Sequence, residues 1–330
     1  MLVFCFFYNP FEPHYQGKSL SAWVAILSQK NSGTVLSEND QRQHLLAAKA
    51  IGNIGPKALP YAVELCRVQD TPLTLHLLEI ADDDGKLLGY QLMTARVAHS
   101  RSWQIFHVLG PAAKPAIPAL IQLLQETNRD IAGIAGVDLT CMGPAVIPAM
   151  IELLTNQNVQ LRVGAATTLM GIGPDFRAQM SPAVPILIQR LNDEDFQVRS
   201  RAANVLIIFD EDASEIVPAL VAAIKQETNT YALFSIARSL GFLGTNAQAA
   251  VPVLVENMQT DQSGRARFEL NALRRISPDV AAVYYQKLNM AQTNPPPDAS
   301  ISNLYYNYFG KGVPFGSPRR GFGPGRGQFF

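Results

Sequence analysis

The chain has 330 residues, of which 48% are hydrophobic and 16% charged, and its 27 basic and 27 acidic side chains give a net charge of zero. This neutrality argues against a protein that wraps a nucleic-acid backbone, because such binding depends mainly on neutralising phosphates. The three cysteines, Cys5, Cys66 and Cys141, have no CxxC spacing, which argues against a zinc knuckle or a redox pair.

Residues 1–8 are strongly apolar. A membrane span takes about 20 residues, so this stretch is too short to cross a bilayer. It also lacks the basic start and the small-residue cleavage site of a signal peptide. We interpret it as the remnant of an export or anchor segment. The alternative is an apolar strand or turn that caps the first repeat. The first interpretation favours a membrane-anchored or periplasmic location, and a cytoplasmic location is the alternative.

Residues 9–42 are predicted to form a leader with one short helix. Pro10 and Pro13 favour an extended start. Ser19 or Ser21 is placed to cap the helix, which carries Trp23 on its apolar side.

Residues 43–292 repeat one phrase, an alanine-rich stretch ending in Leu-x-Gly-x-Gly-Pro and followed by x-Pro-x-Leu. The slot of the second glycine recurs at Gly55, Gly110, Gly143, Gly173, Asp210, Gly244 and Ser277. After a first interval of 55 residues, the steps are 33, 30, 37, 34 and 33. A period in the thirties indicates stacked helix pairs. We therefore expect an all-α fold, a right-handed α-α superhelix of about seven helix pairs.

Each repeat is predicted to contain two helices. The first carries small and apolar residues spaced three and four apart, which places them on one buried face. Two copies of this pattern are Leu45, Ala48 and Ile51, and Leu161, Ala165 and Leu169. The glycine ends the first helix, and a proline in its first turn begins the second. The second-helix prolines are Pro60, Pro118, Pro148, Pro185, Pro218 and Pro252. No strand is expected.

Two segments carry a resemblance to a known family. Residues 158–166, NVQLRVGAA, and 195–203, DFQVRSRAA, resemble HEAT repeats of the bacterial, lyase-like type, and the resemblance extends over residues 43–290. In that family an arginine ties neighbouring repeats through an acidic turn. The resemblance therefore implies this structural role for Arg162 and Arg199, with Asp193 or Asp195 as partners. The matching slots elsewhere hold His44, His99, Ala132, Leu233 and Ala266, so a charge ladder is expected only in the middle of the array.

The leader carries a second, less specific resemblance. Residues 12–23, EPHYQGKSLSAW, are similar to the segment that follows the membrane anchor in some exported bacterial HEAT proteins. This resemblance implies that a membrane tether precedes the leader.

No catalytic, cofactor-binding or metal-binding residues are predicted. The five histidines include no HxH or HExxH spacing. The long first interval adds about 20 residues, roughly 67–88, as a loop or an extra helical turn. It contains Asp82, Asp83 and Asp84, but a calcium loop would need a glutamate at its twelfth position, where Met93 stands.

Residues 293–330 are rich in glycine, proline and aromatic residues, and we expect this tail to be disordered. Its four basic residues against one acidic residue give it a charge of +3, which leaves −3 on the body. Its Arg-Gly-Phe-Gly content resembles RNA-binding segments, which keeps nucleic-acid contact through the tail as an alternative.

The function predicted for the chain is a non-enzymatic scaffold that binds protein partners of unknown identity across the solenoid surface. The resemblance keeps a chromophore-lyase-like enzyme or accessory subunit as an alternative. Acidic turns supply the candidate contact surface. These residues are Asp82, Asp83, Asp84, Glu194, Asp210, Glu211 and Asp212.

Overall fold

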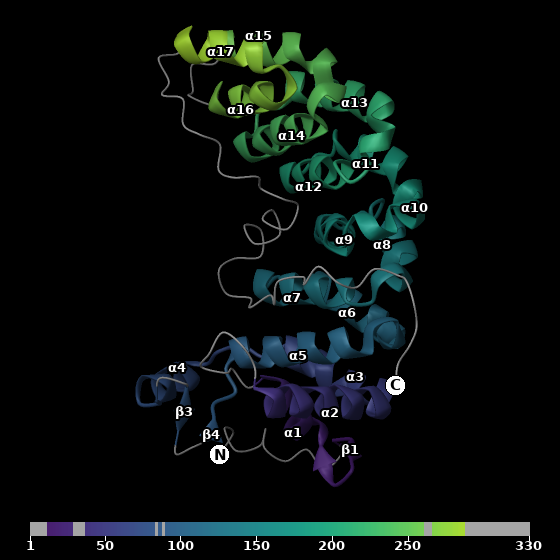
Figure 1. Cartoon of the computed structure of the whole chain (residues 1–330), viewed down its shortest axis with the longest axis vertical. Coiled ribbons are helices and arrows are strands. Elements are labelled where there is room, and N and C mark those ends of the chain that lie inside the picture. The colour runs from purple at the N-terminus through teal and green to yellow at the C-terminus, as the bar shows by residue number, and fades with distance from the viewer. Residues whose placement is uncertain (1–11, 29–36, 83–84, 88–89, 261–265, 288–330) are drawn as a thin grey trace.

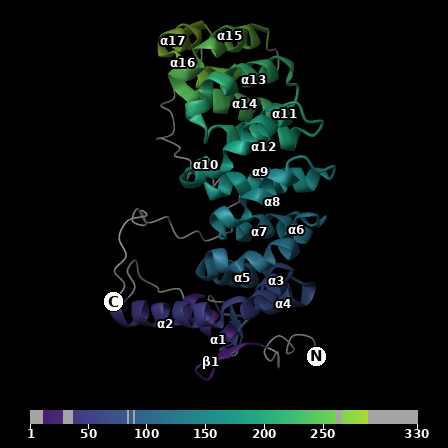
Figure 2. The ribbon, with the colours of Figure 1, turned by 90° about the vertical axis from the view of Figure 1, so that its right-hand side faces the viewer.

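The computed structural model describes residues 12–28, 37–82, 85–87, 90–260 and 266–287. In this part of the chain the protein is an all-α solenoid, as the repeat period predicts, and seven helix pairs follow one another along its long axis (Figure 1). Figure 2 shows the pairs stacked one above another. The predicted anchor remnant at residues 1–8 and the predicted tail at residues 293–330 lie outside the described residues.

The helices form two layers. The first helices of the pairs are α2 (Glu38–Ile54), α5 (Ala95–Leu109), α7 (Arg129–Thr140), α9 (Val159–Ile172), α12 (Phe196–Leu206), α14 (Thr230–Leu243) and α16 (Ala266–Ile276). The second helices are α3 (Leu59–Cys66), α6 (Ile117–Leu124), α8 (Ile147–Leu153), α11 (Val184–Arg190), α13 (Ala213–Gln226), α15 (Val251–Thr260) and α17 (Pro278–Lys287). The array bends into an arc, and α9, α12, α14 and α16 lie on its inner side, the left side in Figure 1.

Local chemistry sets where the first helices begin and end. Asn128, Asn158 and Asn229 precede α7, α9 and α14, and each side-chain oxygen accepts a hydrogen bond from a backbone N–H of the first turn. Gly173 ends α9 with a φ of 80°, a conformation that side chains with a Cβ rarely adopt. Short 3₁₀ turns then lead into the second helices. These turns are Gly55–Ala58, Gly110–Ala116, Gly143–Val146, Pro174–Phe176, Ser181–Ala183, Asp210–Asp212 and Gly244–Ala250.

The prolines begin the second helices in all but one repeat. Pro60, Pro118, Pro148, Pro185 and Pro252 are each the second residue of their helix. The prediction is wrong for Pro218, which lies inside α13 because that helix already begins at Ala213. The turn before α13 has Asp210 in the glycine slot and is only three residues long, so the helix starts earlier in its repeat.

One hydrophobic core runs from Leu20 to Tyr285 between the two layers. The predicted stripe of α9 is buried at Leu161, Ala165 and Leu169. In α2 the prediction is wrong at Leu45, whose side chain is 57% exposed. Ile51 is buried as predicted, and the helix also buries Ala47, Ala50 and Ile54, because α1 (Leu20–Ser28) packs against its alanine face.

The leader folds onto the first repeat. Contrary to the expectation of no strands, β1 (His14–Tyr15) and β2 (Lys18–Ser19) pair through a tight turn at Gln16 and Gly17. Ser19 Oγ accepts a hydrogen bond from Ala22 N at the start of α1, and Trp23 Nε1 donates to Tyr15 O at 3.0 Å. Hairpin and helix together therefore cap the N-terminal end of the core. No helix among the described residues is both long and apolar enough to cross a membrane.

The long first interval forms a helix and a second hairpin. Its elements are α4 (Pro72–Glu79), β3 (Lys86–Leu87) and β4 (Tyr90–Gln91). Asp82 Oδ1 accepts a hydrogen bond from Lys86 N at 2.7 Å, so this carboxylate stabilises the turn before β3. Asp83 and Asp84 lie outside the described residues.

The close approach of α14 and α16 leads to a first testable prediction. A Cβ added at Gly241 would lie 3.1 Å from the Cα of Ala272 on α16, so the two backbones would have to separate. We expect Gly241→Ala to lower the free energy of unfolding by about 1–2 kcal/mol, since the overpacking exceeds the gain in helix propensity. Chemical denaturation measures this change.

Gly133 on α7 is the matched control. It is exposed, and an added Cβ would meet nothing within 4 Å. Gly133→Ala should therefore stabilise the protein by about 0.5–1 kcal/mol through helix propensity alone. Equal effects of the two substitutions would contradict the close packing of α14 on α16.

Candidate interaction surface

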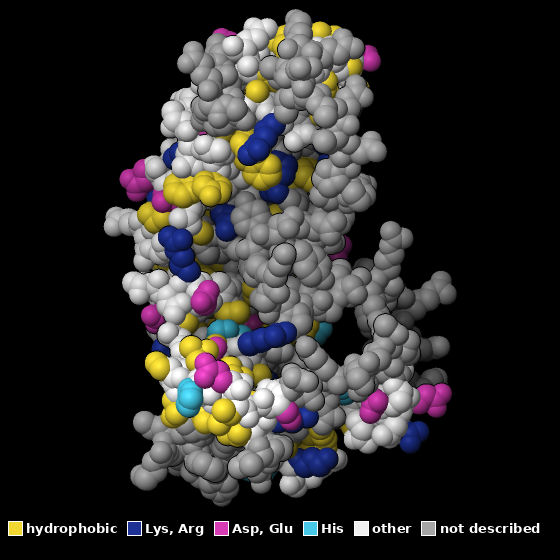
Figure 3. Space-filling view, turned by 90° about the vertical axis from the view of Figure 1, so that its left-hand side faces the viewer, with side chains coloured by type: hydrophobic (Ala, Val, Ile, Leu, Met, Phe, Trp, Pro, Cys, Tyr) yellow, Lys and Arg dark blue, Asp and Glu magenta, His cyan; other side chains and the backbone are white. Residues whose placement is uncertain are grey.

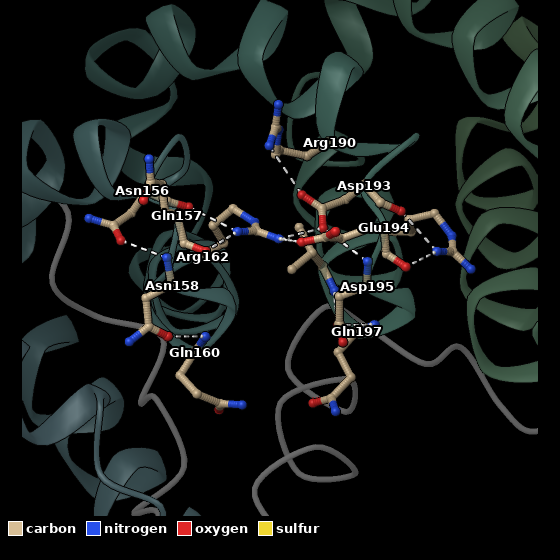
Figure 4. A network of polar contacts seen from close by, with 12 residues as sticks. Asn156, Gln157, Asn158, Gln160, Arg162, Arg190, Asp193, Glu194, Asp195 and Gln197 are labelled. Atoms are coloured by element: carbon tan, nitrogen blue, oxygen red, sulfur yellow. Dashed lines mark hydrogen bonds and ion pairs between the residues drawn. The ribbon is translucent and has the colours of Figure 1, made fainter.

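Arg162 and Asp193 form a buried ion pair between two repeats (Figure 4). Arg162 Nη2 on α9 donates to Asp193 Oδ1 at 2.8 Å, and the two side chains are 5% and 2% exposed. Arg162 Nη1 donates to the carbonyl oxygens of Asn156 and Gln157 at 2.9 Å each. These contacts bind the guanidinium both to the turn before its own helix and to the next repeat.

Arg199 on α12 makes the corresponding contact one repeat later, but with a residue that the sequence did not indicate. Its Nε and Nη2 donate to the two carboxylate oxygens of Glu227 at 2.6 and 2.8 Å, a bidentate arrangement. Burial alone would raise the pKa of Glu227, yet the hydrogen bonds and charge of Arg199, together with backbone hydrogen bonds from Asn229 and Thr228, lower it overall. The Arg199 guanidinium also donates from Nη1 to the carbonyl oxygens of Asp193 and Glu194.

The other carboxylates of this turn have different roles. Asp195 Oδ1 accepts hydrogen bonds from Gln197 N and Val198 N and so caps α12 (Figure 4). Glu194 lies 3.5 Å from Arg162 Nη2, with its side chain 82% exposed.

Asp210 and Glu211 are also engaged between repeats. Arg177 on α10 (Arg177–Met180) forms an ion pair with each of them. Its Nη1 lies 2.7 Å from Asp210 Oδ1, and its Nη2 lies 2.6 Å from Glu211 Oε1. Asp212 is exposed at the end of the same turn. The structure therefore places most of the predicted acidic surface residues in contacts within the array, which leaves less of their charge for a partner.

A row of aromatic rings crosses three first helices. None of these rings is among the contact residues predicted from the sequence. The Phe196 and Tyr231 rings, on α12 and α14, have centroids 6.3 Å apart. One turn further along α14, the Phe234 ring meets the Phe268 ring of α16 edge-on at 5.1 Å. Tyr231 is 73% exposed and Phe234 is 38% exposed. Large apolar side chains are therefore displayed on the side of these helices that faces away from the core.

Arginines lie over these rings. The guanidinium carbon of Arg238 is 5.4 Å from the Phe234 centroid, and that of Arg267 is 5.0 Å from the Phe268 centroid. Arg275 lies 4.5 Å from the Phe242 ring centroid on α14. Such contacts are cation–π interactions. We call the set the aromatic–arginine surface. It comprises Tyr231, Phe234, Arg238, Arg267, Phe268 and Arg275.

This surface belongs to the inner side of the arc. Figure 3 looks onto that side and shows hydrophobic and basic side chains next to one another over its upper half. In the sequence, the spacing of Tyr231, Phe234, Arg238 and Phe242 by three and four residues places them on one helix face, and that spacing was the available signal. The face opposite this stripe is buried at Leu233, Ile236, Ala237 and Leu240.

A second polar cluster is buried between α3, α5 and α7. Asp138 Oδ2 accepts hydrogen bonds from Ser102 Oγ at 2.8 Å and from Cys66 Sγ at 3.2 Å. Burial raises the pKa of Asp138 to about 7, although both hydrogen bonds act in the opposite direction. Burial and the nearby carboxylate of Asp138 both raise the pKa of Cys66 and Cys141, so neither cysteine is an activated thiolate. This inaccessible cluster is part of the core.

Among the described residues, no three or more His, Cys, Asp or Glu side chains lie close enough together to hold a metal ion. His99 is engaged elsewhere, with Nε2 3.1 Å from the carbonyl oxygen of Val68, and His107 stacks on Trp103 at 4.8 Å.

Comparisons with known proteins give one partial family match and several distant structural neighbours. A family model described as HEAT repeats matches residues 184–274. No curated protein matches the sequence. Among solved structures, an engineered protein aligns with 63% of this chain and 98% of its own length, at 20% identity and a TM-score of 0.39. Kap121p aligns with 86% of this chain, at 16% identity and a TM-score of 0.49, and the match covers 32% of its own length, so this chain spans about a third of Kap121p. The match to HEAT repeats covers residues 184–274, and helix pairs of the same arrangement continue on both sides of this segment.

Proposed function

We propose that the chain is a non-enzymatic scaffold that binds a protein partner through the aromatic–arginine surface. The observation that carries this proposal is the exposure of Tyr231, at 73%, within a row of rings on the inner side of the arc. Tyrosine and arginine are the residue types, with tryptophan, that contribute most to protein interfaces. An aromatic side chain offers a large contact area and has few rotatable bonds to order on binding.

The fold supports the same function. Each first helix is fixed in place by its neighbours, so the side chains of α12, α14 and α16 present a preformed surface. A preformed surface loses little conformational entropy when a partner binds. The ion pair of Arg199 with Glu227 ties α12 to the turn before α14, and these two helices carry the Phe196 and Tyr231 rings.

Removing the exposed rings tests the proposal. We expect the variant Tyr231→Ala/Phe234→Ala of the full chain to capture its partner from native-host extract at least about tenfold less well, because truncated hot-spot residues each cost about 2 kcal/mol or more. The Tyr231→Ala change should leave thermal stability nearly unchanged because this ring is mostly exposed, whereas Phe234→Ala removes a partly buried ring and should lower it. Quantitative mass spectrometry of the captured proteins measures the effect.

Leu75→Ala is the matched control, since Leu75 on α4 is also large, apolar and about half exposed, at 52%. It should leave capture unchanged. A captured set that is the same for wild type and for the double variant would overturn the proposal. So would recovery of pigment or nucleic acid in place of a protein partner.

A further inference from the structure

Positive charge is concentrated on the inner layer of the C-terminal repeats. The helices α12, α14 and α16 carry six arginines, Arg199, Arg201, Arg238, Arg267, Arg274 and Arg275. Their one acidic residue, Glu269, is 2% exposed. The second helices α11, α13 and α15 are balanced, with Arg190 and Lys225 against Glu215 and Glu256. Arg199 is paired with Glu227 of the following turn, so the exposed positive charge of this layer lies on other arginines, Arg267 and Arg275 among them.

Two of these arginines are held in place without being neutralised. Arg267 and Arg275 are exposed, and each guanidinium lies over a phenylalanine ring, at 5.0 and 4.5 Å. No ion pair joins either of them to a carboxylate of the described residues. A ring contacts the face of a guanidinium, whereas a carboxylate binds its N–H edges. The rings thus orient these two cations and leave their donor edges for a further group.

We propose that the partner contributes an acidic segment, in which carboxylates alternate with apolar side chains. Its apolar side chains would pack on Tyr231 and Phe234, and its carboxylates would bind Arg267 and Arg275. This inference rests on the proposed function and adds the chemistry of the partner. Arginine suits such a site because its planar guanidinium pairs with a carboxylate through two parallel hydrogen bonds.

The acidic turn before α12 favours a peptide over single-stranded nucleic acid. The carboxylate of Glu194 is 82% exposed at the end of its 3.5 Å contact with Arg162, and it precedes Phe196, whose ring is the first of the aromatic row. A nucleic-acid strand carries a charge at every nucleotide and would be repelled there. A peptide can place an apolar residue at that end of the row and its carboxylates at the other.

Defined peptides test the inference directly on the full chain. The probe is a short fluorescent peptide in which pairs of glutamates alternate with pairs of Leu and Phe, and the comparison peptide has glutamine in place of each glutamate. We expect the acidic peptide to bind with micromolar affinity and the glutamine version to bind at least about tenfold more weakly. Fluorescence anisotropy measures both, at low and at physiological salt.

Charge reversal separates recognition from a merely structural effect. In Arg267→Glu/Arg275→Glu, the acidic peptide should lose at least about tenfold in affinity, and a peptide with lysine in place of glutamate should gain binding. Arg129→Glu, at an exposed arginine of the first helix α7 outside the surface, should leave both affinities unchanged. Equal binding of the acidic and glutamine peptides would overturn the inference. So would tighter binding of a single-stranded oligonucleotide that is lost in the same variant.

The two proposals fail in different ways. If partner capture is lost in Tyr231→Ala/Phe234→Ala but kept in Arg267→Glu/Arg275→Glu, the surface binds a partner and the acidic chemistry is wrong. If neither variant changes capture, the aromatic–arginine surface is not the binding site, and both proposals fail.

Discussion

Replacing Arg162 with alanine is expected to lower the free energy of unfolding by about 3–5 kcal/mol, because the substitution leaves a buried carboxylate without its partner. Asp193 is 2% exposed on its side chain, so its carboxylate has little contact with water in the fold. Asp193 keeps its contact with Arg190 at 3.1 Å, which offsets a part of the loss. The carbonyl oxygens of Asn156 and Gln157 lose a donor as well. Urea denaturation followed by circular dichroism measures the change.

Arg177→Ala is the matched control for this result. Arg177 also joins two repeats through carboxylates, at 2.7 and 2.6 Å, but Asp210 and Glu211 are 64% and 75% exposed. An exposed pair contributes about 0–1 kcal/mol and is screened by salt. If Arg162→Ala costs no more than Arg177→Ala, the buried pair does not stabilise the stacking of the repeats.

Asp138→Asn is expected to make the stability of the protein less dependent on pH. Between pH 4 and pH 7, the free energy of unfolding of wild type should fall by about 4 kcal/mol relative to that of the variant. The pKa of Asp138 is raised from 3.8 to about 7 by burial. Below pH 4 the carboxyl group is protonated in the folded and the unfolded state, and it costs nothing. Between pH 4 and pH 7 the unfolded chain releases the proton while the folded protein retains it, so the free energy of unfolding falls as pH rises. Above pH 7 the loss is complete.

The neutral amide removes this penalty, so the stability of Asp138→Asn relative to wild type should increase from pH 4 to pH 8. Denaturation midpoints of both proteins at these two values measure the effect. Asp130→Asn is the control, because Asp130 is exposed in the first turn of the same helix. A constant difference between wild type and Asp138→Asn at both pH values would show that Asp138 ionises in the fold as it does in water.

The helix pairs were predictable from the sequence because their signals are local. Gly173 and Pro185 act on their own backbone, so the ends of the helices follow from residue chemistry alone. Leu45 shows the limit of such signals. The helix α2 has two apolar stripes, and the one that is buried depends on where α1 packs, which is a property of the assembled array.

The candidate site was less predictable for the same reason. Arg162 pairs with Asp193, one of the partners that the resemblance implied, whereas Arg199 pairs with Glu227, 28 residues away in the turn before α14. The Phe196, Tyr231 and Phe268 rings come from three helices, and only the stacking of those helices brings them into one row. Repeat periodicity gives the helices but not the relative rotation that decides which side chains meet.

The buried pair of Arg162 and Asp193 also bears on how the array assembles. Neighbouring helix pairs offer similar apolar surfaces, so hydrophobic burial alone distinguishes poorly between the right neighbour and a wrong one. A neighbour whose turn supplies no carboxylate would enclose the Arg162 guanidinium unpaired, and that arrangement is strongly unfavourable. The buried charge therefore favours a neighbour whose turn supplies a carboxylate, as the turn before α12 does with Asp193, and disfavours stacking on a turn without one.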